Sequence, residues 1–173
     1  MVAVRATLLG WLLAASLLLS AVGCKVRQPG KLETALAGRV KRGISVGGKK
    51  NVNPLAATTE NIRAGRLNFA HYCFVCHGLD GQNTGVPFAE RMSPPVPELT
   101  ATSVQSYSDG QLKWVIDNGI SPSGMPASRG ILNDDEIWQI VLYLRHLPAK
   151  GSLGEPAVYG GEEKLPSDDG NRR

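Results

Sequence analysis

Residues 73–77 read Cys-Phe-Val-Cys-His, and this pentapeptide constrains the chain more than any other feature because it specifies a cofactor. The pattern C-x-x-C-H is the attachment signature of c-type haem. On a helix, positions 73 and 76 lie on the same side, so both thiols can form thioethers to one haem edge. His77 follows directly and can present its imidazole to one axial face of the iron. The motif therefore predicts one haem c, covalent through Cys73 and Cys76, with His77 as a ligand of the metal.

Three other interpretations of these cysteines are weaker. A structural zinc site needs four Cys or His ligands, usually as two pairs. The chain has three cysteines and three histidines, no second C-x-x-C, and its third cysteine, Cys24, lies far upstream. A thioredoxin-like dithiol needs a βαβ context, and the sequence indicates no strands. A buried structural pair is the third alternative. Haem attachment is favoured over all three because the second half of the chain supplies another ligand.

The second axial ligand is predicted to be Met125. Beyond the leader the chain contains only two methionines, Met92 and Met125, and Met125 lies within Ser-Pro-Ser-Gly-Met-Pro-Ala. The flanking glycine and proline favour a stiff, non-helical loop that can present the thioether sulfur to the metal. Ligation by His and Met raises the haem potential. We interpret Met92 as a packing residue, and His71 and His146 as surface or packing histidines.

Apolar periodicity predicts three main helices and no sheet. The first begins at the threonine pair 58–59 and leads into the motif. The second spans about 109–118 after a Ser-x-x-Gln capping box. The third starts at Asn133 with acidic residues in its first turn, and Pro148 stops it. Residues 78–107 are rich in proline and glycine, which predicts a loop wrapped around the haem.

With these motifs in place, residues 54–148 resemble a class I cytochrome c domain, of the small bacterial type also found in subunit III of cbb3-type oxidases. The resemblance implies an all-α fold, with three to five helices wrapped around one covalently attached haem. It is carried most specifically by the C-x-x-C-H and Gly-Met-Pro sequences. The supporting positions are Gly65, Phe69, Pro87, Gly119, Ile140, Tyr143 and Leu144.

The resemblance also implies roles for two single residues. Gly65 is expected to let the first helix cross the last at close range. Pro87 resembles the family proline whose carbonyl accepts a hydrogen bond from the ligand histidine, here His77. Such a bond would fix the tautomer and basicity of the imidazole. The family's usual Gly-Pro is Val86-Pro87 in this chain.

The first 23 residues are predicted to be a signal peptide. Arg5 gives a positive start, residues 8–19 are almost wholly apolar, and small residues follow. The sequence Ala21-Val22-Gly23-Cys24 also resembles a bacterial lipoprotein box, in which Cys24 would carry the lipid. Export with a free Cys24, or an uncleaved anchor, are the alternatives. We expect an exported protein on the periplasmic side of a bacterial membrane, with a lipid anchor at Cys24.

Charge is distributed unevenly along the chain. Residues 24–50 carry eight Lys or Arg against one Glu, a net charge of +7. Residues 51–150 carry seven against nine acids, a net charge of −2. We interpret residues 24–53 as a basic flexible tether without an apolar face, which is either solvated or held against anionic lipid headgroups. Nucleic-acid binding is not expected. A mildly acidic haem domain predicts redox partners with basic docking patches.

The remaining residues, 149–173, are interpreted as a flexible tail that is disordered or loosely docked. The function predicted for the chain is electron transfer by a haem that cycles between ferrous and ferric states, so the protein is a carrier and not an enzyme. A haem-bearing subunit or docking module of a larger oxidoreductase is the alternative. A ligand-binding or peroxidatic haem is disfavoured, because the neighbours of Met125 in the sequence offer no acid or base.

Overall fold

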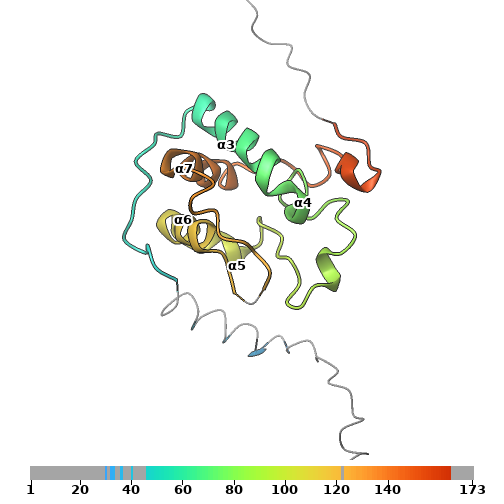
Figure 1. Cartoon of the computed structure of the whole chain (residues 1–173), viewed down its shortest axis with the longest axis horizontal. Coiled ribbons are helices and arrows are strands. Elements are labelled where there is room, and N and C mark those ends of the chain that lie inside the picture. Colours follow the sequence, from blue (N-terminus) through green and yellow to red (C-terminus); the bar gives the residue numbers. More distant parts are fainter. Residues whose placement is uncertain are drawn as a thin grey trace, which may run out of the picture.

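The computed structural model describes residues 30, 32, 33, 36, 40, 46–121 and 123–164. Its helices are α3 (Thr59–Tyr72), α4 (Phe74–His77), α5 (Thr102–Gln105), α6 (Asp109–Asn118) and α7 (Asp134–Leu144), with 3-10 turns η2 (Ala89–Arg91) and η3 (Ala157–Tyr159) (Figure 1). Within the described residues the sheet content is limited to three isolated bridges. The predicted all-α fold is confirmed.

Local capping signals fix where the main helices begin. The Thr58 hydroxyl accepts a hydrogen bond from the backbone N–H of Asn61 at 3.2 Å, which starts α3. A reciprocal capping box opens α6, as predicted, and a second one joins Asn133 to Glu136 at the start of α7. The last helix ends at Leu144, four residues before the proline expected to stop it.

Helices α3 and α7 cross at very short range, and Gly65 makes this possible. A Cβ atom at Gly65 would lie 1.9 Å from the carbonyl oxygen of Gln139 in α7. Any larger side chain would therefore have to push the two helices apart. The prediction that this glycine permits the close crossing is confirmed. Figure 1 shows α3 and α7 stacked in this way, with α6 beneath them.

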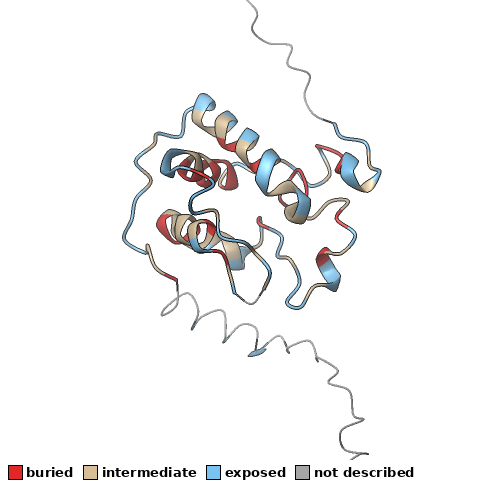
Figure 2. Cartoon of the chain, viewed as in Figure 1, coloured by how far each residue is buried: buried red, intermediate tan, exposed pale blue. Residues whose placement is uncertain are grey.

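One apolar core lies among α3, α6 and α7 (Figure 2). Helix α7 contributes most of it, since its residues from Ile137 to Leu144 are buried apart from Gln139. Phe69 of α3 is 1% exposed and its ring centroid lies 5.3 Å from that of Tyr143. The core residues are Phe69, Leu99, Leu112, Ile116, Leu132, Ile137, Trp138, Ile140, Val141, Tyr143 and Leu144.

The segment before α3 packs against the domain earlier than the sequence suggested. Val46 is buried, and a Cβ at Gly47 would lie 2.6 Å from the indole nitrogen of Trp114 in α6. Gly48 lies equally close to Gly110, because a Cβ there would be 2.2 Å from the Gly110 carbonyl oxygen. The described part of the tether from residue 46 onward therefore lies on α6 rather than free of the fold.

The last segment is folded where the structure describes it. Leu153 and Pro156 are buried, and residues 153–164 fold back on themselves through a bridge between Gly154 and Glu163. Of the two predicted forms of the tail, disordered or loosely docked, the described part has the folded one, with these two apolar side chains buried.

Several predictions concern residues outside the described part of the chain. The leader, Cys24 and its lipidation, and residues 165–173 all lie there, so these predictions stay predictions. Among the residues that the structure describes, no helix combines the length and the apolar character needed to cross a membrane.

Candidate haem-binding site

The C-x-x-C-H motif occupies one short helical turn. Cys73 caps α4, and its carbonyl accepts hydrogen bonds from the N–H groups of Cys76 at 3.1 Å and His77 at 3.0 Å. Both cysteines are half-buried and free. Burial, and then the neighbouring Cys76, raises the pKa of the Cys73 thiol to about 12. A redox-active dithiol depends on a lowered thiol pKa, so the raised pKa of Cys73 argues against a dithiol of that kind.

His77 is held neutral by its surroundings. Burial lowers the pKa of the imidazole to about 4, and the backbone of Pro97 partly opposes this shift. The ring centroid of Phe69 lies 6.4 Å from that of His77. The Nδ1 atom of His77 is buried and makes no hydrogen bond of good geometry. The lowered pKa leaves the imidazole neutral, with a nitrogen lone pair available to a metal.

The proline whose backbone acts on the pKa of His77 is Pro97. Pro87 is exposed and lines a separate polar cavity, and the predicted contact of its carbonyl with His77 stays a prediction. The loop after the motif runs away from it through η2 and then comes back. On its return, Leu99 N–H bonds the Gly81 carbonyl at 2.8 Å, and the Asn83 amide bonds the Val96 carbonyl at 2.8 Å. This pairing brings Pro97 back alongside the motif.

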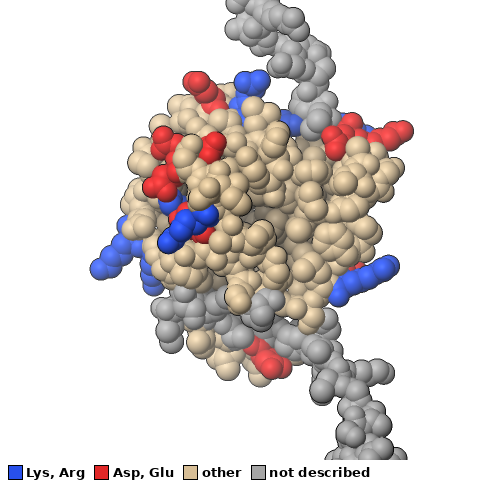
Figure 3. Space-filling view, in the orientation of Figure 1, with Lys and Arg blue, Asp and Glu red and all other residues tan. Residues whose placement is uncertain are grey.

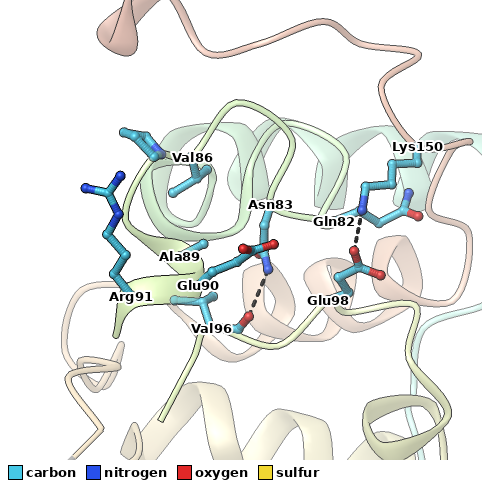
Figure 4. A pocket seen from close by; sticks show the side chains of 10 residues that line it. Gln82, Asn83, Val86, Ala89, Glu90, Arg91, Val96, Glu98 and Lys150 are labelled. Carbon is cyan, nitrogen blue, oxygen red and sulfur yellow. Dashed lines mark hydrogen bonds and ion pairs between the residues drawn. The ribbon is translucent and has the colours of Figure 1, made fainter. Parts of the chain in front are cut away.

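The cavity that Pro87 lines has a volume of about 370 Å³ and is polar (Figure 4). Figure 4 shows Asn83 bonded to Val96 on one wall and the ion pair of Lys150 with Glu98 on another. None of Cys73, Cys76, His77 or Met125 lines this cavity. The cavity therefore belongs to the loop and not to the site that the motif predicts.

Two buried side chains hold the loop directly after the motif. Asp80 is 0% exposed, and its carboxylate accepts hydrogen bonds from Gln82 N–H at 2.9 Å, Thr84 Oγ1 at 2.6 Å and Gly151 N–H at 2.7 Å. From α7, the Tyr143 hydroxyl donates to the Leu79 carbonyl at 3.3 Å. Burial raises the pKa of Tyr143 to about 12, which keeps this hydroxyl a donor.

Met125 lies on a loop that closes on itself at the end of α6. Ile120 N–H bonds the Met125 carbonyl at 3.0 Å, and Ser123 N–H bonds the Ile120 carbonyl at 2.9 Å. Gly119 has a φ of +67°, and a Cβ there would lie 2.5 Å from the Met125 carbonyl oxygen. The loop therefore needs glycine at this position, and it holds Met125 in a defined place.

Both predicted halves of the site contact the apolar core. Cys73 and Met125 are both partly buried and both pack against the same apolar cluster. Met92 also approaches the methionine loop, since its Cε would be 3.4 Å from a Cβ at Gly124. His71 and His146, by contrast, are exposed. Figure 3 shows an uncharged surface between α4 and α6, with the described charged side chains placed around it.

Sequence comparison identifies this arrangement. A model of the family described as cytochrome C oxidase, cbb3-type, subunit III matches residues 60–144. Residues 60–144 therefore form a class I c-type cytochrome domain. The cytochrome domain is also 29% identical over 91 residues to the quinohemoprotein alcohol dehydrogenase ADH IIB of Pseudomonas putida. The matched residues are 53% of this chain but only 12% of that enzyme.

One solved structure also resembles the cytochrome domain. The reducing HAO-like protein complex of Kuenenia stuttgartiensis matches with a TM-score of 0.45 and 24% identity, over 54% of this chain and 46% of that one. Both relatives share only part of their length with this chain.

A cytochrome c domain implies haem c, and the residues present fit that group. The described turn offers two free thiols, and the neutral His77 has a buried Nδ1 that still lacks a well-formed bond. Across the same core, the braced loop offers a thioether sulfur. The sequence had identified all four of these side chains. It missed Pro97, for which the sequence offers no local signal, and it missed Asp80 and Tyr143 as supports.

Proposed function

We propose that this cytochrome transfers single electrons through one haem c, attached at Cys73 and Cys76 and ligated by His77 and Met125. The observation that carries the proposal is the turn of α4, where two free thiols and a neutral, half-buried imidazole come together. A haem bound there supplies an iron couple that accepts and releases one electron without bond chemistry in a substrate. The protein is thus a carrier.

Different residues of the chain would hold the haem in different ways. In this proposal the proton of His77 is on Nδ1, so that the lone pair of Nε2 is kept for the metal. The Met125 loop presents a soft ligand that favours the reduced state. Leu79 and the rest of the loop after the motif are fixed to α7 through Tyr143. The ligand set would therefore stay in place in both oxidation states.

A redox titration of the purified chain tests the proposal directly. We expect a mass increase of one haem that survives denaturation, a reduced-minus-oxidised difference spectrum of c type, and a single one-electron midpoint. Carbon monoxide should leave the reduced spectrum unchanged, because both axial positions are filled. A colourless chain would overturn the proposal. A spectrum that responds to carbon monoxide would point to a ligand-binding haem.

A second candidate is a haem-bearing subunit of a larger oxidoreductase. It is favoured by the match to a quinohemoprotein alcohol dehydrogenase, of which the matched part is a small fraction. Membrane fractions purified through a tag on this chain would separate the two candidates. Stoichiometric co-purification of a dehydrogenase or oxidase supports the subunit, and a single haem protein supports the free carrier.

The carrier is further proposed to be exported and held at the periplasmic side of a bacterial membrane by a lipid on Cys24 and by the basic tether. Besides the eight basic residues, the described apolar residues Leu32, Leu36 and Val40 are helical, exposed and spaced by four. Contrary to expectation, this tether has apolar side chains that can enter a bilayer interface. Sedimentation with anionic liposomes should weaken with salt and with Leu36→Ser.

Its redox partners are proposed to carry basic patches. Supporting this, Glu155, Glu162 and Glu163 are exposed, and Figure 3 shows acidic side chains gathered over the end of the described chain. A partner that docks there would lose association rate as salt rises. Stopped-flow reduction by a basic and by an acidic redox protein across a salt series measures this difference.

A further inference from the structure

The most unexpected feature of the fold is the segment after α7, residues 153–164, here called the strap. Two backbone hydrogen bonds close it: Glu155 N–H to the Glu162 carbonyl at 3.1 Å, and Lys164 N–H to the Leu153 carbonyl at 2.7 Å. A carboxylate of Glu163 also accepts from Ala157 N–H at 3.0 Å. The strap is thus a folded unit with its own internal bonds.

The strap makes its contacts with the motif and with the loop that follows it. Two residues before the strap begins, Gly151 N–H bonds the buried Asp80. In the middle of the strap, a Cβ at Gly85 would lie 2.6 Å from the Cβ of Glu155. At its tip, the Tyr159 ring meets Phe88 edge-on with centroids 5.9 Å apart. Figure 1 shows this segment beside α4, far from α6.

The tip also reaches the motif itself. The Tyr159 hydroxyl donates to the carbonyl oxygen of Val75, the third residue of C-x-x-C-H, at 2.7 Å. Tyr159 therefore touches the outer side of the turn whose inner side carries His77.

We propose that the strap, through Tyr159, restrains the outer edge of the attachment turn and screens the haem edge next to Cys76 from solvent. The expected effect on the midpoint potential rests on the proposed function, since it requires the haem. Water beside a haem edge stabilises the ferric charge, so loosening the strap, which admits water to that edge, should lower the midpoint potential. Tyr159 is a positioning residue here and not a ligand.

Tyr159→Phe is the variant that tests the strap. It removes the hydroxyl but keeps the ring against Phe88. Its matched control is Val158→Ala in the same 3-10 turn, where the side chain is 61% exposed. Loss of one hydrogen bond predicts roughly fivefold faster amide hydrogen exchange in peptides that cover the strap and residues 73–88. Peptides from α3 and α7 should be unchanged, which shows an intact fold.

Amide exchange and the midpoint potential are both measured on the full-length chain with haem attached. Faster exchange in the strap with a lowered midpoint for Tyr159→Phe, and no change for Val158→Ala, supports the proposal. Equal exchange in the wild type and Tyr159→Phe overturns it, and so does equal acceleration by both variants. Faster exchange at an unchanged midpoint overturns the screening. A chain without covalent haem would instead contradict the proposed function. Mass spectrometry of the same peptides detects the missing haem separately from the exchange rates.

Discussion

The His77 side and the Met125 side of the site are built in different ways. The turn and loop that carry His77 are tied to residues more than sixty positions away: Tyr143 bonds Leu79, and Gly151 bonds Asp80. The Met125 loop is tied to the helix just before it, through Ser128 N–H to the Ile116 carbonyl at 3.0 Å and Arg129 N–H to the Asp117 carbonyl at 3.2 Å.

This contrast has a physical consequence. A segment held by distant parts of the chain can loosen only if the tertiary fold opens, whereas a locally closed loop can open alone. Gly124 and Pro126, on either side of Met125, are also exposed. The histidine side should therefore share the stability of the whole domain, and the methionine side should be the more readily changed ligand. Each prediction below tests one side against the other.

The largest effect is expected from loss of both thiols. Cys73→Ala with Cys76→Ala removes covalent haem altogether and leaves a poorly folded chain, because a domain with this thin a core depends on the buried macrocycle. Circular dichroism melting of the exported double variant measures this. A cooperative melt like that of the wild type, from a haem-free chain, would contradict the expected dependence of the fold on haem.

Loss of the methionine ligand should change the haem but spare the fold. Met125→Ala is expected to keep covalent haem, lower the midpoint potential and open the iron to carbon monoxide. Met92→Ala is the matched control, since Met92 reaches the same loop at Gly124 but is not proposed to bind the metal. If Met92→Ala opened the iron and Met125→Ala did not, the ligand assignment would be reversed.

A substitution on the histidine side should show the opposite pattern. Asp80→Asn places an amide where three donors converge on a fully buried carboxylate, so at least one donor loses its acceptor. We expect about 2–3 kcal/mol of lost stability from chemical denaturation of the holoprotein. Asp135→Asn, at an exposed position of α7, should cost under about 1 kcal/mol. Equal losses in both variants would remove the special role of the buried carboxylate.

The sequence predicted those parts of the molecule whose cause is local. Caps at Thr58, Ser108 and Asn133, the close crossing at Gly65 and the all-α fold all follow from signals within a few residues, or from the family resemblance. Ligand types were read from a five-residue motif and a Gly-Met-Pro loop. These signals need no knowledge of how distant segments meet.

The parts that were missed depend on contacts between distant segments. Pro97 reaches His77 only because residues 81–83 pair with residues 96–99 across an excursion of the loop, and a count of prolines cannot show which one returns. In the sequence, nothing distinguishes Asp80 from an acid at the surface. Its role becomes visible only in the fold, where Gly151 donates a hydrogen bond to it. Tyr159 lies in a glycine-rich stretch whose composition is typical of a tail, and its partner Val75 is 84 residues away.

The smallest effect expected is that of Tyr143→Phe, which isolates one long-range tie to the histidine side. The hydroxyl bond to Leu79 is 3.3 Å long and buried, while the ring contact with Phe69 would remain. We expect a loss of about 1 kcal/mol in chemical denaturation, with haem content unchanged. Tyr72→Phe, at a tyrosine that is 52% exposed, should change stability by less than about 0.5 kcal/mol. If Tyr143→Phe instead matched this control while Asp80→Asn remained costly, the link between α7 and the motif would lie in the aromatic packing of Tyr143, and the hydroxyl bond would contribute nothing to holding His77.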